Sequence, residues 1–364
     1  MPDAIWIDEQ AEVQSLAERL AGHASIAVDT EFLREKTFFP RLCLVQIAAG
    51  ADIWCVDAIR APLDPLVPAL TAVGTRKLIH AARQDLEALH LATKRVVTPV
   101  FDTQVAAGCV GFKPQTGYAE LVHGLLGVSL EKAHTRADWS KRPLSAAQVA
   151  YAADDVRYLE EVARLLTEKL HALGRENWAL EDCAALEDVR LFEPDPARAW
   201  ERVRGINQLD APCRARAKAL AVWRERIARE RDLPRSWVLS DAAIFEIAHT
   251  NPATPAALAG LREIPPNYNA RFAAALLDAL QDPAATSPDG GEPRPEARPT
   301  DAEKALINRL NTIVDRRAAE LAISAELLAP RGQIKALALG RRDVGALQGW
   351  RRAEIGERLL AAVD

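Results

Sequence analysis

Two carboxylates that lie two residues apart are the first feature of this sequence that could do chemistry. Asp29 and Glu31 belong to the segment AVDTEF, whose apolar residues predict a strand passing close to a hydrophobic core. Residues at positions i and i+2 of a strand point to the same face of a sheet. Two partly buried carboxylates held side by side repel each other unless a cation neutralises them. Taken alone, the pair is better explained as two solvated acids at the end of a strand.

Three further residues could join this pair. Asp85 is expected early in a helix, where a carboxylate often only offsets the helix dipole. Tyr151 and Asp155 are four residues apart in YAADDVRYL, so a helix would place both on one face, one turn apart. Asp154 points about a quarter turn away and competes with Asp155 for the assignment. Each of these features alone is compatible with an ordinary amphipathic helix.

The five residues together are much more specific than any one of them. Four carboxylates give all-oxygen ligation, which suits Mg²⁺ or Mn²⁺. Such a set can hold two ions roughly 4 Å apart, the arrangement for in-line phosphoryl displacement. In that chemistry one ion activates the attacking water and the other stabilises the leaving 3′ oxygen. A tyrosine hydroxyl could then orient the water or help to deprotonate it.

The elements that must position these residues indicate an α/β domain. Residues 24–57 have the alternation and β-rich composition of three strands with short connections, which favours an antiparallel meander. Beyond residue 62, helical spacing alternates with the strand-like segments KLIHA and VFDT, and it continues to about residue 190. Three strands followed by alternating helix and strand predict a domain with a mixed sheet.

The rest of the sequence predicts helices. Residues 196–281 have helical apolar spacing, and residues 301–364 return to it. The intervening segment 282–300 is rich in Pro, Gly and small polar residues and has no large apolar side chain, which is typical of a flexible linker.

Charge is distributed unevenly along the chain. The net charge is −5, and residues 1–190 contain 20 Lys and Arg against 27 Asp and Glu, whereas residues 198–235 contain 11 against 5. This basic island, residues 198–235, predicts contacts with nucleic-acid phosphates, although a solvated helix with i,i+4 ion pairs is the alternative. Phe32 could stack on the terminal base or belong to the core. The candidate phosphate contacts are Arg214, Arg216, Lys218, Arg224 and Arg226.

Several protein classes are not expected. The five cysteines are far apart, with no CxxC pair, and no HExxH is present, so a zinc site is not predicted and the thiols should be reduced and mostly buried. No run of eighteen apolar residues occurs, which argues against a membrane span. The N-terminus MPDAIWIDEQ lacks the basic and apolar regions of a secretory signal, so a cytoplasmic location is the default expectation.

The order DTE, HAARQDLEAL, YAADD resembles the three exonuclease motifs of the DEDD superfamily, in the branch whose last motif is Tyr-x-x-x-Asp. The surrounding sequence is similar to the ribonuclease D family over roughly residues 1–190. The similar segments are AVDTEFLREKTFFPRLCLVQIA, KLIHAARQDLEAL, VFDTQVAAG and DWSKRPLSAAQVAYAADDVRYL. The resemblance implies a ribonuclease H-like fold and 3′→5′ trimming of RNA to nucleoside 5′-monophosphates. It also implies that Tyr151 positions the water and that the metal ligands are Asp29, Glu31, Asp85 and Asp155.

The helical segments resemble HRDC domains, which are small nucleic-acid-binding modules. Residues 196–281 do so through WERVRGINQL and LAVWRERIARERDLPRSWVLSD, and residues 301–364 do so more loosely. The expected organisation is an α/β exonuclease domain at 1–190, an HRDC domain at 196–281, the linker at 282–300 and a second HRDC-like domain at 301–364. The expected substrate is RNA with an accessible 3′ end, including tRNA precursors. A 3′→5′ DNA exonuclease of the proofreading type and a non-catalytic RNA-binding protein are the alternatives.

Overall fold

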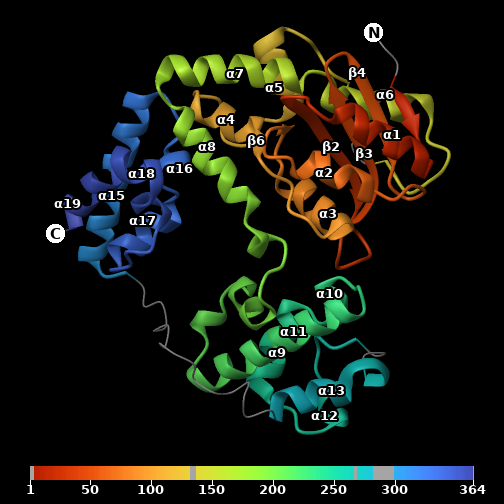
Figure 1. Cartoon of the computed structure of the whole chain (residues 1–364). Coiled ribbons are helices and arrows are strands. Elements are labelled where there is room, and N and C mark those ends of the chain that lie inside the picture. Colours follow the sequence, from red (N-terminus) through yellow and green to blue (C-terminus); the bar gives the residue numbers. More distant parts are fainter. Residues whose placement is uncertain (1–3, 132–136, 266–268, 282–298, 364) are drawn as a thin grey trace. The chain divides into compact units, whose positions relative to one another are not determined.

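The computed structural model describes residues 4–131, 137–265, 269–281 and 299–363 (Figure 1). The chain divides into two compact units. The first unit consists of Met1–Leu33, Arg41–Phe192 and Pro299–Asp364, and the second of Arg34–Pro40 and Glu193–Arg298. The linker predicted at 282–300 lies outside the described residues, apart from its last two positions.

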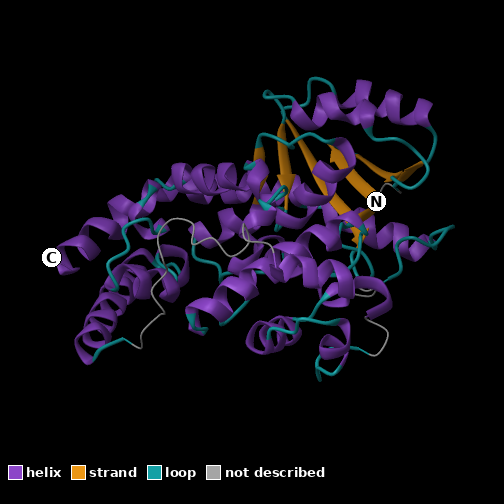
Figure 2. Ribbon diagram, turned by 90° about the horizontal axis from the view of Figure 1, so that it is seen from below, coloured by secondary structure: helices purple, strands orange, loops and turns teal. Residues whose placement is uncertain are grey.

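A six-stranded mixed sheet lies at the centre of the first unit (Figure 2). Its strands are β1 (Ile5–Ile7), β2 (Ser25–Leu33), β3 (Arg41–Ala49), β4 (Asp52–Asp57), β5 (Arg76–Ile79) and β6 (Val100–Asp102). They are arranged in the order β1-β4-β3-β2-β5-β6. Strands β2, β3 and β4 form the antiparallel meander, whereas β1 on β4, and β5 and β6 beyond β2, are parallel. The predicted mixed sheet is confirmed, but β1 was missed because three residues show no periodicity.

Helices cover both faces of this sheet (Figure 2). One face packs against α1 (Gln10–Leu20), α2 (Val67–Thr71) and α3 (Arg83–Thr93). The other face packs against α4 (Thr103–Cys109), α5 (Tyr118–Leu126), α6 (Ala146–Arg157) and α7 (Leu159–Leu173). Alternation along β3 divides its side chains between the two faces: Val45 and Ile47 join the first core, and Leu44 joins a small core beneath α6. A sheet buried on both sides explains why RLCLVQIA is almost wholly apolar.

The helices that follow residue 299 pack onto helices of the α/β domain. They are α15 (Asp301–Leu321), α16 (Ala325–Leu328), α17 (Arg331–Ala338), α18 (Gly349–Arg351) and α19 (Glu357–Val363). Leu310 and Ile334 belong to the same hydrophobic cluster as Leu121 of α5 and Leu166 of α7. The C-terminal helices therefore share one core with the α/β domain.

Polar contacts reinforce this packing through α8 (Glu176–Ala184). The rings of Trp178 and Trp350 stack with centroids 4.1 Å apart and an interplanar angle of 9°. Arg351 donates to both carboxylate oxygens of Asp182, at 2.6 and 2.9 Å. Just before α8, Arg175 donates to the carbonyls of Cys109 and Leu321, and so joins α4 to α15.

The second unit is helical in the residues that the structure describes. Its α-helices are α9 (Ala211–Glu230), α10 (Arg235–Val238), α11 (Asp241–Thr250), α12 (Pro255–Ala259) and α13 (Asn269–Gln281). The segment Arg34–Pro40, which joins β2 to β3, also belongs to this unit. Phe38 lies in its core, and the backbone N–H groups of Phe38 and Phe39 donate to Asp232 at 3.0 Å.

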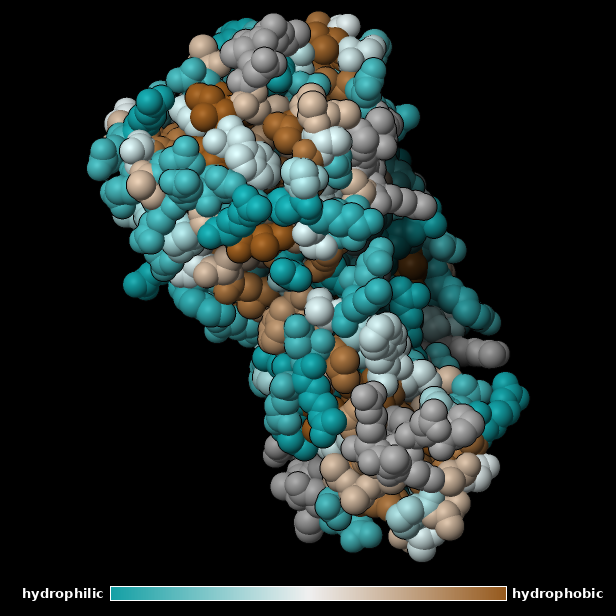
Figure 3. All heavy atoms as spheres, turned by 90° about the vertical axis from the view of Figure 1, so that its right-hand side faces the viewer, coloured by the Kyte–Doolittle hydropathy of each residue, from teal (hydrophilic) through white to brown (hydrophobic). Residues whose placement is uncertain are grey.

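The remaining turns of 3₁₀ or π helix are short. They are η1 (Asp64–Leu66), η2 (Ala185–Glu187), η3 (Val189–Leu191), η4 (Pro196–Arg202), η5 (Ile206–Gln208), η6 (Gly345–Leu347) and η7 (Arg352–Gly356). Across the described residues, no helix has both the length and the apolar character needed to span a membrane. On the face shown in Figure 3, hydrophobic residues lie among hydrophilic ones. All five cysteines are free and buried, as their scatter along the chain predicts.

Candidate active site

Strand β2 presents Asp29 and Glu31 to the face of the sheet that α6 covers. In the register with β3, Asp29 lies opposite Gln46, and Glu31 lies opposite Leu44 of the small core beneath α6. The pairing shifts by one residue directly after Glu31, and a bulge of this kind bends a strand and redirects its side chains. Both carboxylates therefore reach the same side of the sheet, as their spacing predicts.

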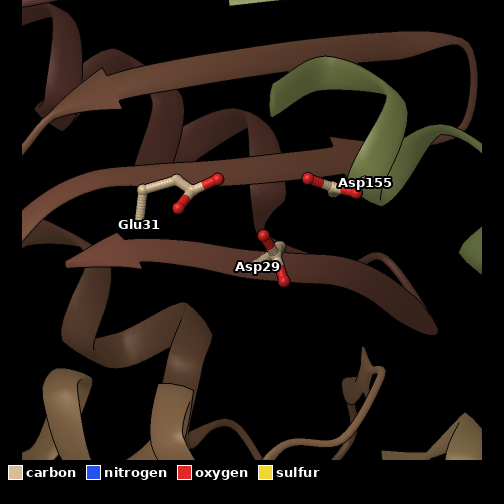
Figure 4. A group of neighbouring side chains, drawn as sticks. All are labelled: Asp29, Glu31 and Asp155. Carbon is tan, nitrogen blue, oxygen red and sulfur yellow. The ribbon is translucent and has the colours of Figure 1, made fainter. Parts of the chain in front are cut away.

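Asp155 of α6 joins these two carboxylates. One oxygen from each of Asp29, Glu31 and Asp155 lies within 4.8 Å of the others. Figure 4 shows the carboxylates of Glu31 and Asp155 facing each other beside Asp29. All three side chains are partly buried. The structure thus brings together three of the four predicted ligands from two separate elements.

Asp85 comes from α3, on the opposite face of the sheet, and contacts the site through Thr30. The Thr30 hydroxyl donates to a carboxylate oxygen of Asp85 at 2.5 Å, and both side chains are buried. Asp85 lies outside the group of three, but its charge contributes to raising the pKa of Asp29 and of Glu31. Thr30 was not singled out in the sequence, because only the fold brings α3 beside β2.

The start of α3 is fixed by Asp102, at the end of β6. Its carboxylate accepts hydrogen bonds from the backbone N–H groups of Ala81 and Ala82, at 3.1 and 2.8 Å. The same carboxylate accepts from Gln104 and caps α4. Asp102 therefore holds the helix that carries Asp85 against the neighbouring strand.

Tyr151 lies one turn before Asp155 on α6. Its ring packs beside the buried Trp139, with centroids 6.2 Å apart and an interplanar angle of 30°. Asp154, the alternative to Asp155, instead accepts from Arg157 at 2.6 Å and has a side chain that is 41% exposed. The geometry therefore places Asp155, rather than Asp154, beside Asp29.

All four carboxyl groups have raised pKa values, and loss of hydration on burial is the largest cause in each. The pKa of Glu31 rises to about 8, and the pKa values of Asp85 and Asp155 rise to about 7. The pKa of Asp29 is raised well above its usual value, first by burial and then by the neighbouring carboxylates. No lysine, arginine or histidine in the described part of the chain forms an ion pair with any of the four. Within that part of the chain the ionised forms lack a neutralising partner, so cations bound at the site would favour them.

This donor set fits hard divalent cations. Its ligands are carboxylate oxygens, which suit Mg²⁺ and Mn²⁺ and not the softer metals that prefer sulfur or imidazole. Gln46, opposite Asp29, is fully buried, and within the described residues neither of its amide atoms has a hydrogen-bond partner. A buried amide normally has a partner, so Gln46 is an exception next to the strand that carries Asp29 and Glu31.

Three residues of the basic island are held inside the second unit. Arg214 and Arg224 are 8% and 6% exposed. Arg224 donates to the carbonyl of Leu239 and to Asp241, and Arg216 donates to the carbonyl of Ala248. Much of the surplus positive charge at residues 198–235 thus stabilises the helical fold itself.

The other predicted nucleic-acid contacts differ in their accessibility. Arg226 is exposed and pairs with Glu230 at 3.0 Å, so its guanidinium can reach solvent. The Lys218 ammonium lies 3.9 Å from the centre of the Trp200 ring. Phe32 is partly buried and packs against the core formed with α1 and α3. Contact of these residues with RNA stays a prediction.

The fold and the carboxylate cluster fit one class of protein, the 3′-5′ exonucleases. Residues 4–171 match the model of the 3′-5′ exonuclease family, and residues 214–280 match that of the HRDC domain. Ribonuclease D of Gluconacetobacter diazotrophicus is 38% identical over 100% of this chain and 93% of its own length. Ribonuclease D of Acidiphilium cryptum is 37% identical over 99% of this chain and 93% of its own.

The solved structures agree with these relatives. Escherichia coli RNase D, described as an exoribonuclease involved in structured RNA processing, superimposes with a TM-score of 0.90 and 29% identity, over 100% of this chain and 99% of that one. The chain therefore belongs to the ribonuclease D family. The fold class and the enzyme class expected from the sequence, a 3′→5′ exoribonuclease with a ribonuclease H-like domain followed by helical regions that include an HRDC domain, are confirmed.

Proposed function

We propose that this chain removes nucleotides one at a time from the 3′ end of RNA, at a site formed by Asp29, Glu31, Asp85, Tyr151 and Asp155. The observation that carries this proposal is the convergence of three carboxylates from β2 and α6 within 4.8 Å of one another. Their raised pKa values support it, because such a cluster is costly for folding unless it binds cations.

The four carboxylates are proposed to hold two Mg²⁺ or Mn²⁺ ions. Bound cations would polarise the scissile phosphate and offset the negative charge that develops on the leaving 3′ oxygen. The three oxygens that lie within 4.8 Å of one another come from Asp29, Glu31 and Asp155. Asp85 adds a fourth carboxylate from the opposite face of β2.

Tyr151 is proposed to orient the attacking water through its phenolic hydroxyl. The water oxygen bonds to the phosphorus of the terminal phosphodiester, and the bond from phosphorus to the 3′ oxygen of the preceding nucleotide breaks. That 3′ oxygen takes up a proton, so the products are a nucleoside 5′-monophosphate and an RNA that is one nucleotide shorter with a 3′ hydroxyl. A positioned proton-transfer group of this kind typically contributes about 10²–10⁴ in rate.

The substrate is proposed to be RNA with an accessible 3′ end, including tRNA precursors. The relatives named ribonuclease D and the structured-RNA role of the Escherichia coli protein support this proposal. The basic island would add affinity through its exposed side chains, of which Arg226 is the clearest among the predicted contacts. A cytoplasmic location stays a prediction from the sequence.

Matched RNA and DNA oligonucleotides of one sequence, labelled at the 5′ end, test the proposal. With Mg²⁺, the RNA should shorten in single-nucleotide steps, and the released products should be nucleoside 5′-monophosphates. With EDTA, no product should form. Faster degradation of the DNA would support the proofreading-type alternative. Binding of RNA without release under either Mg²⁺ or Mn²⁺ would support a non-catalytic RNA-binding protein.

A further inference from the structure

The turn that precedes α6, at residues 139–142, is fixed to the sheet by the guanidinium group of Arg142. Its Nε and Nη2 donate to the two carboxylate oxygens of Asp57, the last residue of β4, at 2.5 and 2.8 Å. Nη2 also donates to the carbonyl of Cys43 at 2.8 Å. Nη1 donates to the carbonyls of Trp139 and Lys141, at 2.7 and 2.8 Å. The group therefore joins β3, β4 and the turn in one network.

All the donors of this guanidinium are engaged inside the protein. The side chain of Asp57 is 0% exposed and that of Arg142 is 12% exposed. Burying an ion pair costs desolvation free energy that the attraction between the charges often only balances, so such a pair is weak evidence for a gain in stability. Its bidentate geometry, in contrast, strongly fixes orientation. The pair is therefore better explained by what it positions.

Its clearest target is Trp139. Arg142 holds the backbone carbonyl of this residue, and the side chain is 2% exposed. Cys43, whose carbonyl accepts from the same guanidinium, is the β3 residue left without a partner at the bulge opposite Glu31. The indole of Trp139 lies beside the ring of Tyr151, with centroids 6.2 Å apart.

The ring of Tyr151 rests on a core of its own. Beneath α6, Trp139 forms a cluster with residues of β3, β4 and α6, and Tyr151 packs against that cluster. The buried members besides Trp139 are Cys43, Leu44, Cys55 and Ala152. The indole of Trp139 is the aromatic side chain among the buried members of this cluster, and it lies beside the Tyr151 ring. A shift of the turn would move the indole and, with it, a surface against which the tyrosine ring packs.

We propose that the Arg142–Asp57 pair is a positioning device for Tyr151. It fixes the turn, the turn fixes Trp139, and Trp139 holds the tyrosine ring so that its hydroxyl stays aligned with the carboxylates. The inference rests on the proposed role of Tyr151 in orienting water. Arg142 and Asp57 act on the tyrosine through Trp139, so both are positioning residues. Misplacing a reacting group by about 1 Å can cost on the order of 10² in rate.

A double-mutant cycle tests this device with Arg142→Lys, Tyr151→Phe and the combined variant. Lysine keeps the charge but loses the bidentate geometry. Arg142→Lys should lower the single-turnover kcat by on the order of 10-fold, with KM unchanged, and Tyr151→Phe should lower it by on the order of 10². In the Tyr151→Phe background, Arg142→Lys should have little further effect, because the hydroxyl that it positions is gone.

Two further variants keep the test decisive. Arg351→Lys breaks a second bidentate Arg–Asp pair of low exposure, between Arg351 of α18, which is 22% exposed, and Asp182 of α8, which is 18% exposed. It should leave kcat unchanged in both backgrounds, which controls for a general loss of stability. Trp139→Phe keeps a smaller ring beside Tyr151 and replaces Arg142→Lys in the cycle if the lysine variant does not fold. Its loss of kcat should also vanish in the Tyr151→Phe background.

The unfavourable outcomes can be told apart. A rise in KM with kcat unchanged in Arg142→Lys would mean that the guanidinium binds RNA, and this would overturn the inference. An equal loss of kcat in both backgrounds would also overturn it, while leaving the role of Tyr151 intact. Wild-type kcat in Tyr151→Phe alone would instead remove the proposed role of Tyr151, and the positioning device with it.

Discussion

Asp85, Asp155 and Glu31 have pKa values of about 7, 7 and 8, well above the 3.8 and 4.5 of free aspartate and glutamate side chains. A carboxyl group whose pKa is higher in the folded than in the unfolded state stabilises the fold most at low pH. That stabilisation is lost as the pH rises from about 4 through the folded pKa values. Each unit of pKa difference corresponds to about 1.4 kcal/mol.

We therefore expect the metal-free protein to lose stability between pH 5 and pH 8. Thermal unfolding in EDTA should show a melting temperature that falls across this range, and added Mg²⁺ should restore it at pH 8, because cations favour the ionised carboxylates. Asp155→Asn should reduce the pH dependence, since it removes one of the titrating groups. Asp154→Asn is the matched control, because Asp154 is 41% exposed and paired with Arg157. A wild-type pH dependence no steeper than that of Asp155→Asn would contradict the burial of ionisable carboxylates at this site.

The residue types of the site could be predicted from the sequence, but several of their contacts could not. The spacing of Asp29 and Glu31 gave their common face, because strand periodicity is local. The bond from Thr30 to Asp85 joins residues 55 positions apart, and the packing of Trp139 on Tyr151 depends on how a turn folds back on the sheet. Such contacts depend on tertiary structure, for which one sequence holds no periodic signal.

At the scale of elements, α6 is the helix that carries both Tyr151 and Asp155. It begins with a capping box, in which the Ser145 hydroxyl accepts from the backbone N–H of Gln148 and the Gln148 side chain accepts from the backbone N–H of Ser145. Along the helix, Ala153 and Val156 are buried in the cluster that includes α7, and Ala152 is buried in the small core with Trp139. The helix is thus held at its start by the cap and along its length by packing.

Ser145→Ala should separate these two contributions. The loss of the cap should lower the free energy of unfolding by about 1 kcal/mol, while kcat stays close to that of the wild type because packing still fixes the catalytic turn. Ser240→Ala removes the same kind of cap from α11 and should have a similar cost in the second unit. Denaturant titrations of the three proteins, together with their kcat values, make the comparison. A fall in kcat of tenfold or more in Ser145→Ala alone would show that the cap itself positions the site.

The individual strands and helices could be predicted from the sequence more completely than their grouping into compact units. The antiparallel meander and the helical region after residue 196 were recognisable because their apolar periods repeat over many residues. Residues 301–364 were expected as a helical domain of their own, and the structure instead includes them in the compact unit of the exonuclease domain. Helical periodicity identifies a buried face but does not specify what covers it. Whether these helices are HRDC-like stays a prediction.

At the scale of the whole molecule, the C-terminal helices should be needed for a stable exonuclease domain. Trp350 is 6% exposed and stacks on Trp178, so Trp350→Ala should lower the free energy of unfolding of the first unit by about 3–5 kcal/mol. Trp237→Ala, at a residue 57% exposed, is the matched control and should cost little. Equal stabilities of the two variants would show that the stack contributes nothing. A truncation after residue 195 also removes this support, so it cannot isolate the contribution of the basic island.

Point substitutions isolate that contribution. Arg226 is exposed and its pair with Glu230 is weak in water, so Arg226→Gln should lower RNA affinity and make the slope of log K against log salt shallower by about one. Arg164→Gln on α7, also exposed and paired with acids, is the control outside the island. Fluorescence anisotropy with labelled RNA in Ca²⁺, at several salt concentrations, gives both quantities. Unchanged affinity and slope in Arg226→Gln would identify this part of the island as a solvated helix face.

The most direct test of the central claim compares Asp155→Asn with Asp154→Asn. The two residues are neighbours on α6, but only Asp155 lies within 4.8 Å of the carboxylates of Asp29 and Glu31. The measurement is single-turnover release of nucleotides from 5′-labelled RNA in Mg²⁺, with RNA binding measured in parallel. Asp155→Asn should abolish release and keep binding, and Asp154→Asn should release nucleotides nearly as the wild type does. Activity near the wild type in Asp155→Asn, or its loss in Asp154→Asn instead, would contradict the proposed metal site.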